Sequence, residues 1–128
     1  MPLLFRSFIM TNQELKQLRR LLFIEVSEAA ALIGECEPRT WQRWEKGDRA
    51  IPNDVSREIQ MLALTRLERL QVEFDETDPN YRYFETFDEY KAYGGTGNEL
   101  KWRLAQSVAT SLLCETEADK WREEETID

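Results

Sequence analysis

The chain has 128 residues, of which 41% are hydrophobic and 33% are charged, and its net charge is −8. This length supports a buried core of one small domain plus an appendage, and the composition is that of a globular rather than a disordered protein. The sequence contains no histidine, which excludes Ser/His and Cys/His catalysis and the usual nitrogen ligands of metals. We therefore expect neither an enzyme nor a metal or cofactor.

The negative charge is concentrated in the second half of the chain. Residues 10–72 carry ten Lys or Arg and ten Asp or Glu, whereas residues 73–128 carry six and fifteen. The first part is thus neutral overall, and a local basic face on it can still bind phosphate groups.

Two features favour a cytoplasmic protein without a membrane segment. Cys36 and Cys114 lie far apart, without the spacing of a zinc site, and are expected to be free thiols. The opening "MPLLFRSFIM" lacks a basic n-region and is too short to span a membrane. Either Met1 or Met10 can be the true start, and residues 1–10 are interpreted as an N-terminal extension.

Two helices are predicted at the beginning of the chain. Thr11 and Glu14 have the spacing of a capping box, and leucines at helical intervals then predict a helix over 12–23. Ser27 is expected to cap a second helix, "SEAAALIG", which Gly34 ends. Its small residues indicate tight packing against a neighbouring helix.

Two more helices complete the first domain, which we place at 11–72. Pro38 suits the first position of a third helix, and Gly47 suits its C-terminal end. The segment "AIPNDV" then begins a long fourth helix with an apolar stripe, ending near Val72.

The remaining residues are expected to form an acidic linker, 73–80, and a small α+β dimerisation region, 81–128. The letters "YRYF" are typical of a strand, while Thr86 and Glu89 form a capping box for a short helix. A longer helix follows over about 99–113, and the acidic tail "ETEADKWREEETID" is expected to fray. The predicted fold is therefore mainly α.

The long C-terminal helix carries a broad apolar stripe beside small residues, which permit close approach of another helix. The second half is too small to bury a good core alone, so a homodimer is expected to form through this helix. The predicted interface residues are Trp102, Ala105, Val108, Ala109 and Leu112.

The predicted third helix, "PRTWQRWEK", has two chemically different faces. At about 100° per residue, Trp41 and Trp44 share one face. The opposite face carries Arg39, Gln42, Arg43 and Lys46. Arg can donate two hydrogen bonds to guanine and Gln can pair with adenine, so this face could read a DNA major groove. Lys46 and Arg49, at and beyond the helix end, are better placed for phosphates.

Other interpretations stay open. The outward face of this helix could simply be solvated, and the acidic second half could bind a basic partner, as in an antitoxin-like interaction module. The aromatic run from Tyr81 to Tyr93 could stack on single-stranded bases, but the lack of interleaved cations favours core or dimer packing.

The segment "SEAAALIG … RTWQRWEKGDRAIP" resembles the helix-turn-helix of the lambda-repressor-like (XRE, Cro and C1) class. Together with "MTNQELKQLRRLL" and "LKWRLAQSVATSL", it resembles the YdiL-like proteins, including the anti-CRISPR-associated (Aca-type) regulators. This resemblance implies an N-terminal four- to five-helix DNA-binding domain. It also implies a homodimeric transcriptional repressor that binds an inverted repeat in double-stranded DNA, often in its own operon's promoter. Some such regulators are thought to bind RNA, which nothing in the sequence indicates.

The resemblance also implies roles for individual residues. The base-reading positions of the class fall on Arg39, Gln42 and Arg43, with Thr40 beside them, and the phosphate-contacting position falls on Ser27. The acidic position that pairs with an arginine of the first helix falls on Glu45. Its partner here is Arg19.

Overall fold

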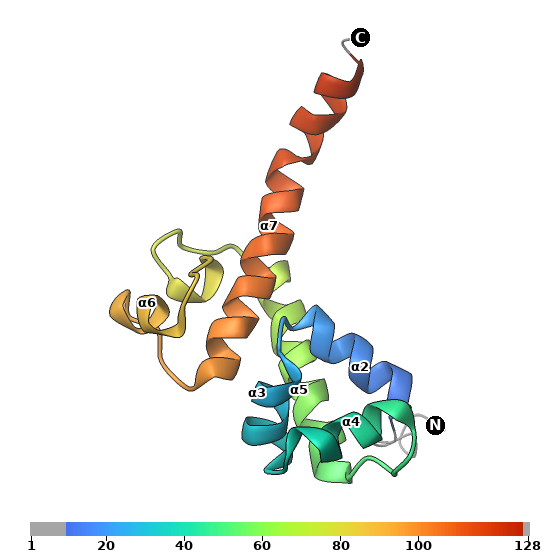
Figure 1. Cartoon of the computed structure of the whole chain (residues 1–128). Coiled ribbons are helices and arrows are strands. Elements are labelled where there is room, and N and C mark those ends of the chain that lie inside the picture. Colours follow the sequence, from blue (N-terminus) through green and yellow to red (C-terminus); the bar gives the residue numbers. More distant parts are fainter. Residues whose placement is uncertain (1–9, 127–128) are drawn as a thin grey trace, which may run out of the picture. The chain divides into compact units, whose positions relative to one another are not determined.

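The computed structural model describes residues 10–126, so residues 1–9 of the expected extension lie outside the described part. The chain divides into two compact units, Met1–Glu68 and Arg69–Asp128 (Figure 1). Among the described residues, no helix is long and apolar enough to cross a membrane.

The described part of the chain is helical and contains no β-strand, so the expected α+β character of the C-terminal region is wrong. The "YRYF" letters begin at the end of a short 3₁₀ helix, η2 (Pro79–Tyr81), and continue as irregular chain. The Phe84 carbonyl, which a strand would use for pairing, accepts hydrogen bonds from Trp102 Nε1 at 2.8 Å and Gln106 Nε2 at 2.9 Å. Side-chain donors therefore satisfy this carbonyl in place of the backbone of a neighbouring strand.

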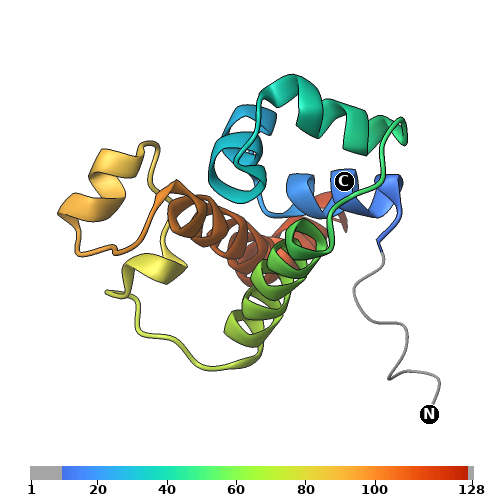
Figure 2. The same cartoon turned by 90° about the horizontal axis from the view of Figure 1, so that it is seen from below.

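The first unit is built from four helical segments. They are α2 (Asn12–Leu21), α3 (Val26–Ala29) with its continuation η1 (Ala30–Gly34), α4 (Pro38–Lys46) and α5 (Asn53–Gln71), which ends beyond the unit. Both views show α2 alongside α4 (Figures 1 and 2). The buried apolar side chains include Leu15, Leu22, Ile24, Ala29, Ala30, Ile33, Val55 and Ile59.

The predicted capping box starts α2. The Thr11 backbone N–H donates to Glu14 Oε1 at 2.9 Å, and the Glu14 N–H donates to Thr11 Oγ1 at 3.1 Å. The helix ends at Leu21 rather than at Phe23, which takes the left-handed φ of 64° that turns the chain toward α3.

The next helix begins and ends differently from the prediction. Glu25, not Ser27, holds the N-cap position, and its backbone N–H donates to Glu28 Oε1 at 2.9 Å. Ser27 lies exposed in the first turn. At the other end Gly34 is the last helical residue, and Glu35 takes the left-handed conformation, with φ 49°. The left-handed turn that ends this helix is therefore made by Glu35, and Gly34 has a different structural role.

The second unit contains η2, α6 (Phe87–Ala92) and α7 (Glu99–Thr126). The side chain of Thr86 caps α6 as predicted, accepting from the Glu89 N–H at 3.1 Å. The acidic tail expected to fray is instead helical as far as Thr126. Its residues are good helix formers, and Arg122 pairs with Asp119 at 3.0 Å one turn earlier.

A small aromatic core organises the second unit. Tyr90, Trp102 and Ala105 are buried together, and the rings of Phe84 and Phe87 pack against them. The Tyr90 hydroxyl donates to Asn80 Oδ1 at 2.8 Å, and burial raises the pKa of this phenol. The aromatic run is therefore core in large part.

Candidate nucleic-acid interface

Local signals fix both ends of α4. Pro38 occupies its first turn, where a missing N–H costs nothing, and Gly47 takes the left-handed C-cap conformation with φ 85°. The backbone N–H of Asp48 then donates to the Arg43 carbonyl at 2.9 Å, closing the helix end. The helix has the predicted bounds as a result.

The two faces of α4 differ sharply in burial. Trp41 is fully buried and Trp44 is only 6% exposed. Their rings meet edge to face, with centroids 5.5 Å apart. On the opposite face Arg39, Gln42 and Lys46 are exposed. Thr40 and Arg43 are half-buried at its edge. The helix is thus held from behind and presents long polar side chains outward.

Gly34 lets η1 approach the two indoles closely. A Cβ at this position would lie 2.8 Å from Cys36 Sγ, 3.1 Å from the Trp44 ring and 3.2 Å from the Trp41 ring. These distances are shorter than ordinary van der Waals contact, so only glycine fits without rearrangement. Burial raises the pKa of the adjacent Cys36 thiol.

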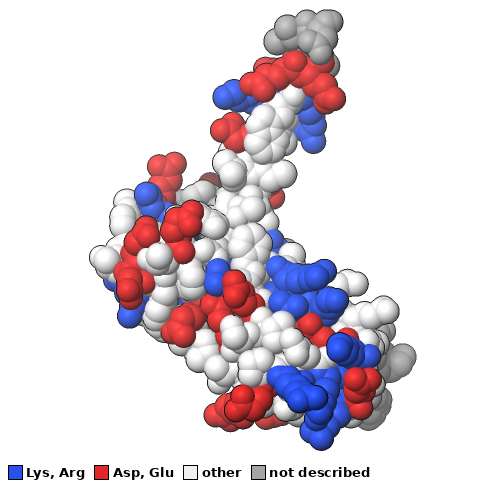
Figure 3. Space-filling view, viewed as in Figure 1, with Lys and Arg blue, Asp and Glu red and all other residues white. Residues whose placement is uncertain are grey.

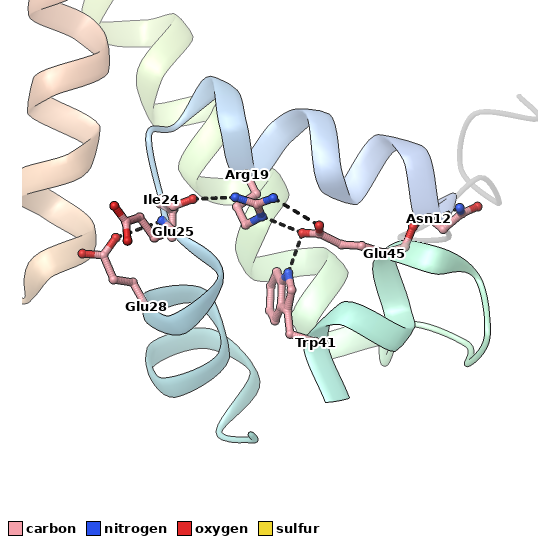
Figure 4. A network of polar contacts seen from close by, with 7 residues as sticks. All are labelled: Asn12, Arg19, Ile24, Glu25, Glu28, Trp41 and Glu45. Carbon is pink, nitrogen blue, oxygen red and sulfur yellow. Dashed lines mark hydrogen bonds and ion pairs between the residues drawn. The ribbon is translucent and has the colours of Figure 1, made fainter. Parts of the chain in front are cut away.

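The carboxylate of Glu45 is the centre of a polar network that joins α4 to α2 (Figure 4). Arg19 Nε donates to Glu45 Oε2 at 2.6 Å, and Arg19 Nη2 donates to Oε1 at 3.1 Å. Trp41 Nε1 also donates to Oε2, at 2.6 Å. The Arg19 and Glu45 side chains are only 11% and 8% exposed, so solvent screens this ion pair weakly.

Two further hydrogen bonds of this network were not anticipated from the sequence. Arg19 Nη1 donates to the Ile24 carbonyl at 3.0 Å, and Asn12 Nδ2 donates to the Glu45 carbonyl at 3.1 Å (Figure 4). The i, i+4 spacing of Trp41 and Glu45 could have indicated the indole contact, because such residues are neighbours on a helix. The contacts to backbone carbonyls have no comparable signal.

Basic side chains are frequent on the surface of the first unit near α4. Figure 3 shows Lys and Arg gathered over the part of the first unit formed by α2 and α4. Of the residues expected to contact phosphates, Ser27 lies in the first turn of α3, Lys46 ends α4 and Arg49 lies in the following loop. All three are exposed. They therefore lie on three different segments of the first unit.

The expected dimer-interface residues of α7 fall into two groups. Trp102, Ala105 and Val108 are buried within the chain itself. Ala109 and Leu112 are half-buried. Further along the helix, an apolar pocket of about 420 Å³ is lined by Tyr83, Ala109, Thr110 and Leu113. Tyr83 and Leu113 are 52% and 56% exposed, so they extend the apolar surface beyond the predicted residues.

No metal centre is visible in the described part of the chain, since residues 10–126 contain no group of three or more His, Cys, Asp or Glu placed to hold an ion.

Fold and site together describe a small helical protein that presents one anchored helix with a cationic outer face.

An Aca2/YdiL-like family model matches residues 10–120, and the chain belongs to this family. It is 42% identical over 114 residues to the Aca2 repressor of Pectobacterium phage ZF40, an alignment that covers 86% of this chain and 98% of that protein. It is 26% identical over 109 residues to the uncharacterized protein YdiL of Escherichia coli (strain K12), covering 80% and 92% respectively.

Proposed function

We propose that the protein is a sequence-specific DNA-binding repressor in which η1, the turn at residues 35–37 and α4 form a helix-turn-helix. The observation that carries this proposal is the two-sided burial of α4. Its indoles are fixed in the core, and Arg39 and Gln42 are exposed on the opposite side. A helix fits the major groove of B-DNA, where side chains of this kind reach base edges.

Base reading is assigned to the outward side chains of α4. Arg39 and Arg43 are suited to the O6 and N7 acceptors of guanine, and Gln42 is suited to adenine, with Thr40 beside them. Each well-formed bidentate pair would contribute about 1–3 kcal/mol of discrimination against a wrong base. Ser27, Lys46 and Arg49 would contact phosphates, which position the helix without reading sequence.

Repression is supported by the relative named a repressor, to which this chain is 42% identical. A protein bound at a promoter excludes the polymerase sterically, and this mechanism requires no cofactor. We assign the target to an inverted repeat upstream of the protein's own gene, so that the protein regulates its own operon.

An inverted repeat requires a symmetric dimer, with two α4 helices in successive major grooves about 34 Å apart. We assign the dimer contact to the apolar surface of α7 formed by Ala109, Leu112 and Leu113 with Tyr83. Trp102, Ala105 and Val108 support this surface from inside the chain because they are already buried. A two-fold contact of this kind uses the same surface on both copies.

The test is a gel-shift titration with the DNA upstream of the protein's own gene, at a stated salt concentration. We expect Arg39→Ala with Arg43→Ala to reduce affinity at least about 30-fold, because two base contacts of about 1–3 kcal/mol each are lost. The matched control, Lys120→Ala with Arg122→Ala, removes the same charge from exposed positions of α7 and should bind nearly as tightly.

Circular dichroism and sedimentation would establish that both variants keep their helicity and assembly state. If the α4 variant bound the DNA as tightly as the control variant, the proposal that α4 reads bases would be wrong.

A further inference from the structure

A pocket beside α4 contains two lysines without partners. The pocket has a volume of about 310 Å³ and is lined by Lys16, Arg19, Val26, Gln42, Glu45 and Lys46. Lys16 projects from the middle of α2 and Lys46 is the last residue of α4; both are exposed. Within residues 10–126, the side chain of neither lysine forms a hydrogen bond or an ion pair.

The other two charges of the pocket cancel each other. Arg19 and Glu45 form a bidentate ion pair, and the remaining contact of Arg19 goes from Nη1 to the Ile24 carbonyl. The net charge of the pocket therefore comes from the two ammonium groups. Two like charges facing one concave surface repel each other, and an anion placed between them would lower the energy of both.

We propose that this pocket seats one phosphodiester group of the bound duplex, with Lys16 and Lys46 as its cationic partners. This inference rests on the proposed function and adds to it a residue of α2 that the recognition segment does not contain. Each lysine offers three donors and a compact charge, which suits a phosphate oxygen.

The pocket borders the face of α4 assigned to base reading. Lys46 is about 40° from Gln42 and about 20° from Arg39 around the helix axis. Gln42 also lines the pocket, so the phosphate seat and the reading face are adjacent. A phosphate bound there would fix the register of α4 on the duplex, although it would carry no sequence information itself.

The first experiment measures binding by fluorescence anisotropy at several salt concentrations, with a duplex of the upstream DNA and an unrelated duplex. Lys16→Ala should weaken binding to both duplexes by a similar factor. It should also reduce the slope of log affinity against log salt concentration by about 1. The control, Lys120→Ala, loses the same charge from an exposed position of α7 and should leave the slope unchanged.

A second experiment locates the phosphate. Single neutral methylphosphonate linkages are scanned along the upstream duplex. One linkage per half-site should weaken binding by the unmodified protein more than binding by Lys16→Ala, in which only Lys46 still contacts that phosphate. An unaltered salt slope in Lys16→Ala, while the unmodified protein still binds, would overturn this inference alone. Failure of the unmodified protein to bind either duplex would instead overturn the proposed function.

Discussion

At the scale of single residues, one carboxylate orients α4. Glu45 accepts from Arg19 through both oxygens and from the Trp41 indole, while its backbone carbonyl accepts from Asn12. Because the Arg19 and Glu45 side chains are nearly buried, losing one partner leaves the other charge poorly solvated. The cost of removing Glu45 therefore exceeds the net contribution of the pair.

This difference can be measured with a double-mutant cycle of Arg19→Met and Glu45→Leu. Each single variant should lower the free energy of unfolding by about 3–5 kcal/mol, because a buried charge loses its partner. The double variant should lose clearly less free energy of unfolding than the two single variants lose together, since neither charge remains. Urea denaturation monitored by circular dichroism gives all three values. Additive losses would show that the two side chains act independently.

At the scale of the elements, α4 could be predicted from sequence and the "YRYF" segment could not. Pro38 and Gly47 are local signals that act on the helix containing them. The extended aromatic segment depends on a partner, and its Phe84 carbonyl is satisfied by side chains of α7 distant in the sequence. The candidate site shows the same difference between local and distant signals. The helical spacing of indole and guanidinium side chains predicted both faces of α4. No local signal indicated that Lys16 shares a pocket with Lys46.

The junction between η1 and α4 gives a prediction for Gly34→Ala. Alanine favours a helix over glycine by about 0.5–1 kcal/mol. Its methyl group would however overlap Cys36 Sγ and both indoles, and overpacking of this kind costs about 1–3 kcal/mol. We therefore expect a net loss of stability, measured by thermal denaturation. Adding Cys36→Ala should restore part of it by removing the nearest atom. A stabilised single variant would contradict the tight junction.

At the scale of the whole molecule, residues 10–72 are neutral and residues 73–128 carry a charge of −9, which Arg6 reduces to the net −8 of the chain. Under the proposed function, this acidic region would repel duplex DNA non-specifically and so disfavour binding at random sequences. The division was evident from the sequence because it requires only counting. The dimer surface was not evident from the sequence, because Trp102 and Ala105 become buried only through the folding of the second unit around its aromatic core.

The proposed dimer surface can be tested with Leu113→Glu. Leu113 is 56% exposed and lines the apolar pocket of α7, so glutamate there costs little in the folded chain. In a dimer it would place two carboxylates in an apolar contact, which is strongly unfavourable. We expect monomers in analytical ultracentrifugation and a loss of affinity for the inverted repeat of at least tenfold. Cys114→Ser, an exposed neighbour, is the control. A dimer unaffected by Leu113→Glu would move the interface elsewhere.

The anchoring of α4 from behind has an evolutionary consequence. Trp41, Trp44 and Glu45 hold the helix, whereas Arg39 and Gln42 make no contribution to the buried core. Under the proposed function, exchanging the outward pair would change which bases are preferred while leaving folding almost untouched. A lineage built on this scaffold would then acquire new DNA targets through very few codon changes, without first acquiring compensating mutations in its interior.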